Sequence, residues 1–442
     1  MLPDADSESG HATFRPVQRF AHGAAWSALG SAVGRGFTLV ATVVVARFLG
    51  PSSYGAWGVT QSTIGTAAAL AGLGASYSAT KQIAQHRNSE LEVASGLATL
   101  ALLSAGTGGV LAGVFVAVSA SAIAVEAFHN ASLVPLLELG VPALLFGTFS
   151  GAQLGILTGL EEFRAVALVN IIRGVVVGIA MIAGARLFGV GGAVFGLSCG
   201  EVAGAAAAQL ALVRALKRFS IRLDVAFAWR ERASLWRFNL PTFLAALATQ
   251  PATWLGQVVL VRRYDGLAQA GYFAYAYRWY LFVTFFSAAF APVGLSILTN
   301  VRATMDGGTY RRFLWWTVSL NVLVVTVPAM VLIGAAGVVS SLGGRGFQAA
   351  EPSLIILALA CVPAALNNGL SQAALSLDRV RAWVISDVVL AVALAGVAVL
   401  LVPSLGSVGL AWGYLAGMLA TCAVLIGPVV FAVRRGRDEG VA

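Results

Sequence analysis

Charged residues are scarce in this chain. Only 11% of its 442 residues are Asp, Glu, Lys or Arg, while 58% are hydrophobic; a soluble domain carries about 25% charged residues. This scarcity excludes a soluble globular protein and indicates a protein embedded in a lipid bilayer. The net charge of +9 does not indicate a nucleic-acid partner, because the basic residues are spread over many short loops.

Cysteine, lysine and histidine are also rare. The three cysteines, Cys199, Cys361 and Cys422, lie inside apolar runs at spacings that suit neither a metal site nor a disulfide framework. Neither lysine follows a glycine-rich phosphate loop, and the four histidines lack metal-ligand spacing. An acidic pair at residues 4–6 resembles part of a transferase motif but stands alone in a polar tail. We therefore expect no metal, no cofactor and no enzymatic activity.

Long apolar runs make up most of the sequence. Each can cross a bilayer core of about 30 Å as a helix of about 20 residues. We therefore predict an all-α integral membrane protein, with no cleavable signal peptide in the polar tail. Its twelve expected transmembrane helices span residues 21–46, 56–80, 93–123, 133–158, 165–186, 189–213, 238–261, 271–298, 313–338, 351–376, 382–402 and 408–433.

The basic residues predict an orientation. If the N-terminus is cytoplasmic, 20 of the 28 Lys and Arg residues fall in cytoplasmic segments and 5 on the opposite side. Cytoplasmic loops of membrane proteins carry an excess of Lys and Arg. We therefore expect both termini in the cytoplasm, which agrees with an even number of helices.

A short polar stretch between apolar runs occurs twice. Residues 46–57 read ARFLGPSSYGAW, and residues 262–273 read RRYDGLAQAGYF, at an offset of 216. Further landmarks repeat at an offset of 217. These are LEEFRA at 160–165 with LDRVRA at 377–382, and Gly189, Gly192, Gly196 and Gly200 with Gly406, Gly409, Gly413 and Gly417.

The repeat predicts two homologous halves of six helices each. Because six is even, both halves enter the membrane from the same side and are related by an axis along the membrane normal. The expected parts are a cytoplasmic tail (1–20), the first lobe (21–213), a basic cytoplasmic linker (214–237), the second lobe (238–433) and a second tail (434–442). The glycines repeated every four residues are expected to allow close helix packing inside each half; a ligand role is the alternative.

Charged residues inside the apolar runs are candidate functional residues, because a charge in lipid costs about 2.5–3.5 kcal/mol on insertion scales. Arg35 and Arg278 lie in opposite halves, and their counterparts at the repeat offset, Pro251 and Ser62, are uncharged. This broken symmetry favours one anionic ligand shared between the halves. Structural pairing of each arginine is the alternative.

Three further charges have two interpretations each. Arg173 and Glu201 belong to neighbouring helices, so they can form a structural ion pair or take part in coupling to an ion. Asp387 occupies the repeat position of Asn170, which fits either polar packing or ion coupling.

Aromatic residues accompany Arg278. Tyr275, Phe282 and Phe285 share its helix face by three- and four-residue spacing. Tyr275 and Phe282 are candidate contacts for a sugar or prenyl group. Ordinary packing, or an interfacial aromatic belt for Tyr275, is the alternative.

Three stretches resemble the polysaccharide flippases of the Wzx type, in the superfamily that also holds the MATE drug exporters and the lipid II flippases (the MOP superfamily). They are ARFLGPSSYGAW at 46–57, LGASYSATKQIA at 73–84 and AGYFAYAYR at 270–278 with Pro292 beyond. The similarity extends over about residues 18–432. It implies two lobes around a central cavity lined by helices 1, 2, 7 and 8, with Arg35 and Arg278 facing each other across it.

The resemblance implies a substrate of undecaprenyl-diphosphate-linked oligosaccharide. In that interpretation Arg35 and Arg278 hold the diphosphate and Lys81 attracts it near the cytoplasmic face. The expected protein is a flippase of the bacterial inner membrane, surrounded by lipid and working with polysaccharide polymerase and export machinery. A MATE-type cation-coupled drug exporter is the alternative, and a polymerase or ligase is a more distant one.

Overall fold

The computed structural model describes residues 7–72, 74–86, 90–225, 243, 246–247, 249–263, 265–304, 307–377 and 379–438. Within these ranges the backbone is helical apart from short turns, so the predicted all-α class is confirmed. The first half holds α1 (Ser7–Ala71), α2 (Ala75–His86), α3 (Leu91–Ala122), η1 (Ile123–Ala127), η2 (Ala131–Leu133), α4 (Val134–Gly159) and α5 (Phe163–Arg218). The second half holds a helical stretch over 249–261, followed by α7 (Gly266–Thr304), α8 (Gly307–Gly334), α9 (Ala336–Leu342), η3 (Arg345–Ala350), α10 (Glu351–Ser376), α11 (Val380–Leu405) and α12 (Ser407–Asp438).

Two helices are long enough to cross a membrane twice. About 20 residues suffice for one crossing, whereas the apolar parts of α1 and α5 have 44 and 56 residues. Each helix kinks at one glycine with a positive φ, Gly50 (φ 71°) in α1 and Gly189 (φ 62°) in α5. Each kink therefore separates two crossings, so the eight long apolar helices of the described ranges give ten crossings. The helix α7 corresponds to the expected helix 271–298, and the expected helix 238–261 is described continuously only from residue 249.

Several predicted helix ends were wrong. The expected break between 46 and 56 is only the kink at Gly50, and the chain leaves the helix later, between α1 and α2. The first helix begins at Ser7 rather than at residue 21, so most of the predicted N-terminal tail is helical, and α12 continues to Asp438. Helical hydrogen bonds lie within the segment itself, so polar residues can extend a helix beyond the apolar run. The predicted linker lies outside the described residues from 226 to 237, and its first residues complete α5.

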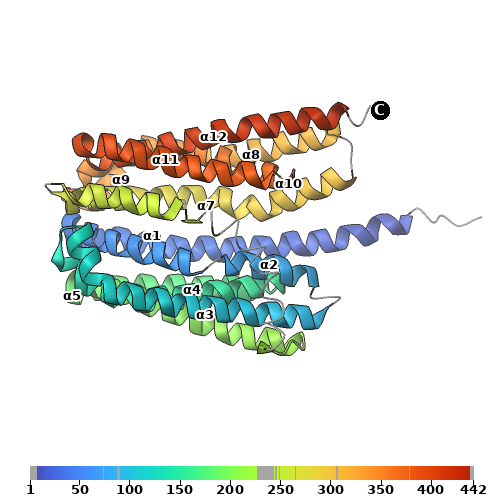
Figure 1. Ribbon diagram of the computed structural model, residues 1–442, viewed down its shortest axis with the longest axis horizontal. Coiled ribbons are helices and arrows are strands. Elements are labelled where there is room, and N and C mark those ends of the chain that lie inside the picture. The colour runs from blue at the N-terminus through green and yellow to red at the C-terminus, as the bar shows by residue number, and fades with distance from the viewer. Residues whose placement is uncertain are drawn as a thin grey trace, which may run out of the picture.

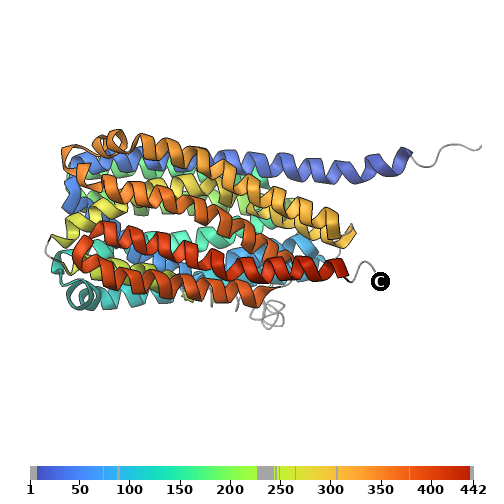
Figure 2. The same ribbon diagram turned by 90° about the horizontal axis from the view of Figure 1, so that it is seen from above.

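The helices form two groups that meet along α1 and α7. In Figure 1, α2 to α5 lie on one side of this seam and α8 to α12 on the other; α1 packs on α5, α7 packs on α10, and α1 and α7 contact each other. The chain begins and ends at the same end of the bundle, beyond which α1 projects (Figure 2). We call the opposite end, where the kinks at Gly50 and Gly189 lie, the distal end.

The two halves repeat the same backbone details. Gly189 has φ 62° and ψ −141°, and its repeat counterpart Gly406 has φ 62° and ψ −131°. Both conformations favour glycine because a Cβ atom would be strained there. The same unusual turn at equivalent positions of the two halves shows that the sequence repeat is also a structural repeat.

Equivalent glycines bring α1 and α7 together near the distal end. A Cβ on Gly55 would collide with the carbonyl oxygen of Leu267, and a Cβ on Gly271 with that of Pro51. Positions 55 and 271 are equivalent in the repeat, as are positions 51 and 267, so the two contacts are reciprocal, as a pseudo-two-fold axis requires. The repeated stretch thus forms the crossing of the two halves.

Two arginines at the distal end form hydrogen bonds between the halves. Nε of Arg47 donates a hydrogen bond to the carbonyl oxygen of Leu342 (2.6 Å), and Nη2 of Arg262 donates to that of Glu126 (2.7 Å). Leu342 and Glu126 are themselves equivalent at the repeat offset. Arg263, the sequence counterpart of Arg47, instead donates to Val402 within its own half.

The glycine ladders pack inside each half, as predicted. Gly192 and Gly196 lie against the backbone of Gly184 and Ala180 in the other arm of α5, and the second-half ladder lies against α11 in the same way. Close approach of helices through small residues accounts for the spacing.

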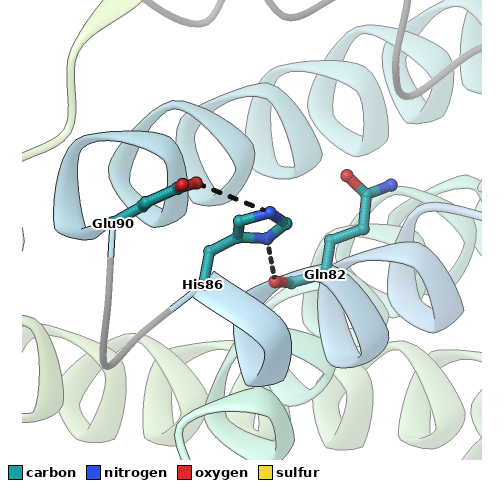
Figure 3. A network of polar contacts seen from close by, with 3 residues as sticks. All are labelled: Gln82, His86 and Glu90. Carbon is teal, nitrogen blue, oxygen red and sulfur yellow. Dashed lines mark hydrogen bonds and ion pairs between the residues drawn. The ribbon is translucent and has the colours of Figure 1, made fainter.

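The end of α2 is fixed to the start of α3. Nδ1 of His86 donates to the carbonyl oxygen of Gln82 (2.9 Å), and Nε2 lies 3.7 Å from the carboxylate of Glu90 (Figure 3). Gln82 in turn donates to Ser78 (2.8 Å). This network orients the last turn of α2. None of its residues lines the arginine-containing cavity between α1, α5 and α7.

Candidate functional site

A cavity of about 320 Å³ lies where α1, α5 and α7 meet. Both arms of α1 and both arms of α5 contribute to its walls. Its lining residues are Ser31, Gly34, Arg35, Thr38, Leu39, Gln61, Asn170, Arg173, Gly174, Val177, Leu197, Glu201, Arg278, Leu281 and Phe282. Arg35 and Arg278, far apart in the chain, therefore reach the same cavity from opposite halves.

Each of these two arginines lies on an aromatic ring from the other half. The guanidinium carbon of Arg35, on α1, is 4.7 Å from the ring centroid of Phe285 on α7. That of Arg278, on α7, is 4.9 Å from the ring centroid of Trp57 on α1. A cation at this distance from a ring centroid is attracted by the electron-rich face. The two stacks thus hold both cations at the seam between the halves.

Arg173 and Glu201 face each other across the two arms of α5. Nη1 of Arg173 lies 3.6 Å from Oε2 of Glu201, and the Glu201 side chain is 18% exposed. That oxygen has no hydrogen-bond partner within the described part of the chain. The ion pair is therefore long and leaves the carboxylate incompletely satisfied.

The lining is positively charged overall. Three arginines and one glutamate contribute among the described lining residues, which leaves an excess of two positive charges. Such an arrangement can bind an anion through charge-assisted hydrogen bonds, for which the guanidinium fork is well suited.

The candidate residues from the sequence did not include the uncharged polar members of the cavity, Ser31, Thr38, Gln61 and Asn170. The buried Oε1 of Gln61 accepts no hydrogen bond from any described residue. Asn170 donates to Oγ of Ser31 (3.1 Å), linking α5 to α1. A single amide inside the second apolar run was the signal that could have identified Gln61.

The two aromatic candidates have different positions. Phe282 lines the cavity. Tyr275 does not, because its ring is 1% exposed, packs against Tyr54 and Phe347, and its hydroxyl donates to the carbonyl oxygen of Val339 (2.7 Å). Tyr275 lies one turn nearer the distal crossing, outside this cavity and packed between the halves, so its contact with a sugar or prenyl group stays a prediction.

Lys81 and Asp387 are also outside the cavity. Lys81 is exposed on α2, which packs on α3 and α4. Asp387 is partly buried on α11 in the second half. Its counterpart Asn170 lines the cavity, so the repeat relation does not extend to a shared site.

Solved transporters of the MOP superfamily share this fold. An inward-facing multidrug resistance MATE family transporter matches with a TM-score of 0.73 and 16% identity, covering 91% of this chain and 96% of that one. The lipid II flippase MurJ, in an inward closed conformation, matches with a TM-score of 0.72 and 14% identity, covering 94% and 90%. A MOP superfamily transporter from Pyrococcus furiosus matches with a TM-score of 0.70 and 15% identity, covering 94% and 95%. The chain is a multi-pass membrane protein with the MOP transporter fold.

Within that class the sequence identifies a family. Residues 20–295 match the family described as "Polysaccharide biosynthesis protein", and the chain belongs to that family. It is also 24% identical over 265 residues to the EPS I polysaccharide export inner membrane protein EpsE of Ralstonia nicotianae. This alignment spans 58% of each chain.

Proposed function

We propose that the chain is a flippase that moves an undecaprenyl-diphosphate-linked oligosaccharide from the cytoplasmic to the outer leaflet of a bacterial inner membrane. The observation that carries this proposal is the convergence of Arg35, Arg173 and Arg278 on one cavity at the seam between the halves. The family match and the export function named for the Ralstonia relative support the same class of cargo.

The charge of the cavity suits a diphosphate. A diphosphate that joins a lipid to a sugar carries about two negative charges, one for each phosphate group, as in other phosphodiesters. Three arginines and one glutamate leave two positive charges in the lining. Charges inside a membrane are tolerated where they pair with opposite charges, so this balance lowers the cost of placing the anion there.

The aromatic stacks leave the arginines able to bind. The guanidinium carbons of Arg35 and Arg278 lie over the rings of Phe285 and Trp57, and a ring accepts no conventional hydrogen bond. The N–H donors of a guanidinium point outward in its plane, so the edges stay available to phosphate oxygens. Phe282 supplies an apolar wall beside them.

The arrangement of the halves supports alternating access. The halves are held together at the distal end by the glycine crossing and by Arg47 and Arg262, while the cavity lies deeper between them. With both termini cytoplasmic, as the basic residues predict, the distal end is the outer face. Transport then requires the distal contacts to separate, and it involves no enzymatic step.

A MATE-type exporter of cationic drugs is the alternative. It is opposed by the cavity charge, because a cation would meet three arginines and only one carboxylate among the described lining residues. The partners expected for the flippase are the lipid-linked oligosaccharide, membrane lipid and the polysaccharide polymerase and export machinery.

Replacement of Arg35 and Arg278 by alanine in the host bacterium tests the proposal. At equal protein level we expect surface polysaccharide to fall and the lipid-linked precursor to accumulate. Arg186→Ala is the matched control, since that arginine is exposed at the distal end and lies outside the cavity. Unchanged export in the double variant would reject the site, and lost resistance to cationic drugs with normal export would favour the alternative.

A further inference from the structure

A second groove of about 300 Å³ opens between the two arms of α5, separate from the cavity. One end is polar and carries Glu162, Arg214 and Arg218; the remainder is lined by Ala165, Leu168, Val169, Ile172, Ala207, Leu210, Ala211 and Ala215. None of these residues lines the arginine cavity. Leu168 and Leu210 are 58% and 61% exposed, as expected for side chains that face lipid.

We propose that this groove binds one anionic phospholipid, such as phosphatidylglycerol, with its phosphate at Arg214 and Arg218 and an acyl chain along the apolar wall. This site is independent of the flippase proposal. It holds a resident lipid of the bilayer, and the cargo lies elsewhere, in the cavity.

The charges at the polar end favour an anion. Nη1 of Arg218 lies 2.9 Å from Oε1 of Glu162, so this pair is neutral overall. Arg214, one turn earlier, is exposed and has no carboxylate partner among the described residues. The polar end therefore has one uncompensated positive charge. It lies near the first and last turns of α5.

The length of the groove fits one leaflet. Glu162 and Ile172 are ten residues apart, which is about 15 Å of helix and about half of the 30 Å hydrocarbon core. Both ends of α5 lie at the same end of the bundle because the helix turns back at Gly189. The arginines are thus placed at a headgroup layer, and the apolar wall runs inward from them to the bilayer midplane.

Native mass spectrometry of the purified full-length chain tests the site. Dioleoyl phosphatidylglycerol and dioleoyl phosphatidylcholine are the probes, so only the headgroup differs. We expect one phosphatidylglycerol to be retained about fivefold more strongly than phosphatidylcholine, since one basic residue near an anionic lipid contributes about that factor. Arg214→Gln should abolish the preference, whereas Lys217→Gln, exposed in the same turn but outside the groove, should keep it. Equal retention of the two lipids, or an equal loss in Lys217→Gln, would overturn the proposal.

A gain of lipid retention cannot be imitated by misfolding, and a matched pair of phenylalanine variants tests the apolar wall. Glu162→Gln frees Arg218 from its ion pair and should raise phosphatidylglycerol retention. Ala207→Phe fills the groove and should lower it, while Ala206→Phe, on the neighbouring exposed position, should not. A decrease in Glu162→Gln, or equal effects of the two phenylalanine variants, would contradict the site.

Discussion

Arg278 lies over the ring of Trp57, with its guanidinium carbon 4.9 Å from the ring centroid. The arginine comes from α7 and the tryptophan from α1, so the contact crosses the seam between the two halves. Arg35 and Phe285 make the reverse contact, from α1 to α7. Both halves therefore contribute to the candidate site.

Removal of the Trp57 ring should weaken cargo binding. A cation–π contact contributes about 0.5 to 2 kcal/mol, so Trp57→Leu should lower the affinity for undecaprenyl diphosphate roughly 2- to 30-fold. Trp316→Leu is the control, because that tryptophan is 58% exposed on α8. Titration of the purified protein with the lipid measures both. An unchanged affinity for Trp57→Leu would show that Arg278 needs no aromatic support.

Removal of the Glu201 carboxylate should strengthen anion binding. Its partner Arg173, 3.6 Å away, would then be free to contact the phosphates, and the excess of positive charge in the lining would rise. We expect Glu201→Gln to bind undecaprenyl diphosphate about fivefold or more tightly, which corresponds to about 1 kcal/mol. Transport measured with and without a pH gradient separates the two interpretations of the pair. If transport by this variant no longer responds to the gradient, Glu201 takes part in proton coupling. If the response is retained, Glu201 forms a structural ion pair with Arg173.

A methyl group at the crossing should separate α1 from α7. In Gly55→Ala the Cβ would meet the backbone oxygen of Leu267, which no side-chain rotation can relieve. Overpacking of this kind costs about 1–3 kcal/mol, so the melting temperature in detergent should fall. Gly65→Ala is the control in the same helix, because no atom lies within 4 Å of its Cβ position. Equal melting temperatures for the two variants would contradict the tight crossing.

Loss of the distal arginine contacts should favour opening at that end. Arg47→Ala together with Arg262→Ala removes the hydrogen bonds to Leu342, Ala127 and Glu126. Labelling of Gln61→Cys by an impermeant maleimide added outside, in a background without the native cysteines, should increase several-fold. Arg345→Ala, exposed on η3, should leave labelling unchanged. No increase in the double variant would show that these contacts do not restrain the distal end.

The sequence predicted the all-α membrane architecture because membrane thickness and gene-level repetition leave direct traces in it. Apolar runs of bilayer length and a repeat offset that agrees at three landmarks are direct consequences of how such a chain is built. The same repeat also predicted the equivalence of Gly55 with Gly271, although not that the two would meet. Arg35 and Arg278 were identifiable because a charge within an apolar run is costly and needs a reason.

Other features of the candidate site depend on how the helices pack, which residue spacing along the chain does not reveal. Tyr275 shares a helix face with Arg278, yet one turn away it is covered by the rings of Tyr54 and Phe347. Lys81 is on the short α2, whose start is set by the break between α1 and α2 and whose position the apolar pattern did not give. Gln61 was overlooked because a neutral amide is less unusual in a helix than a charge. The breaks at 46–56 and 186–189 were expected, but not that each would narrow to a kink at one glycine, Gly50 or Gly189, because glycine allows a turn without requiring one.

The most direct test is lipid transfer in vesicles that contain only the purified chain and a fluorescent oligosaccharide linked to undecaprenyl diphosphate. A membrane-impermeant glycosidase outside the vesicles reports the cargo that has crossed. We predict transfer by the natural chain, little by Arg35→Ala with Arg278→Ala, and intermediate transfer by the two lysine replacements, which keep the charge but lose the guanidinium fork. Full transfer by the double alanine variant, or none by the natural chain, would contradict the assignment of the cavity arginines to the cargo.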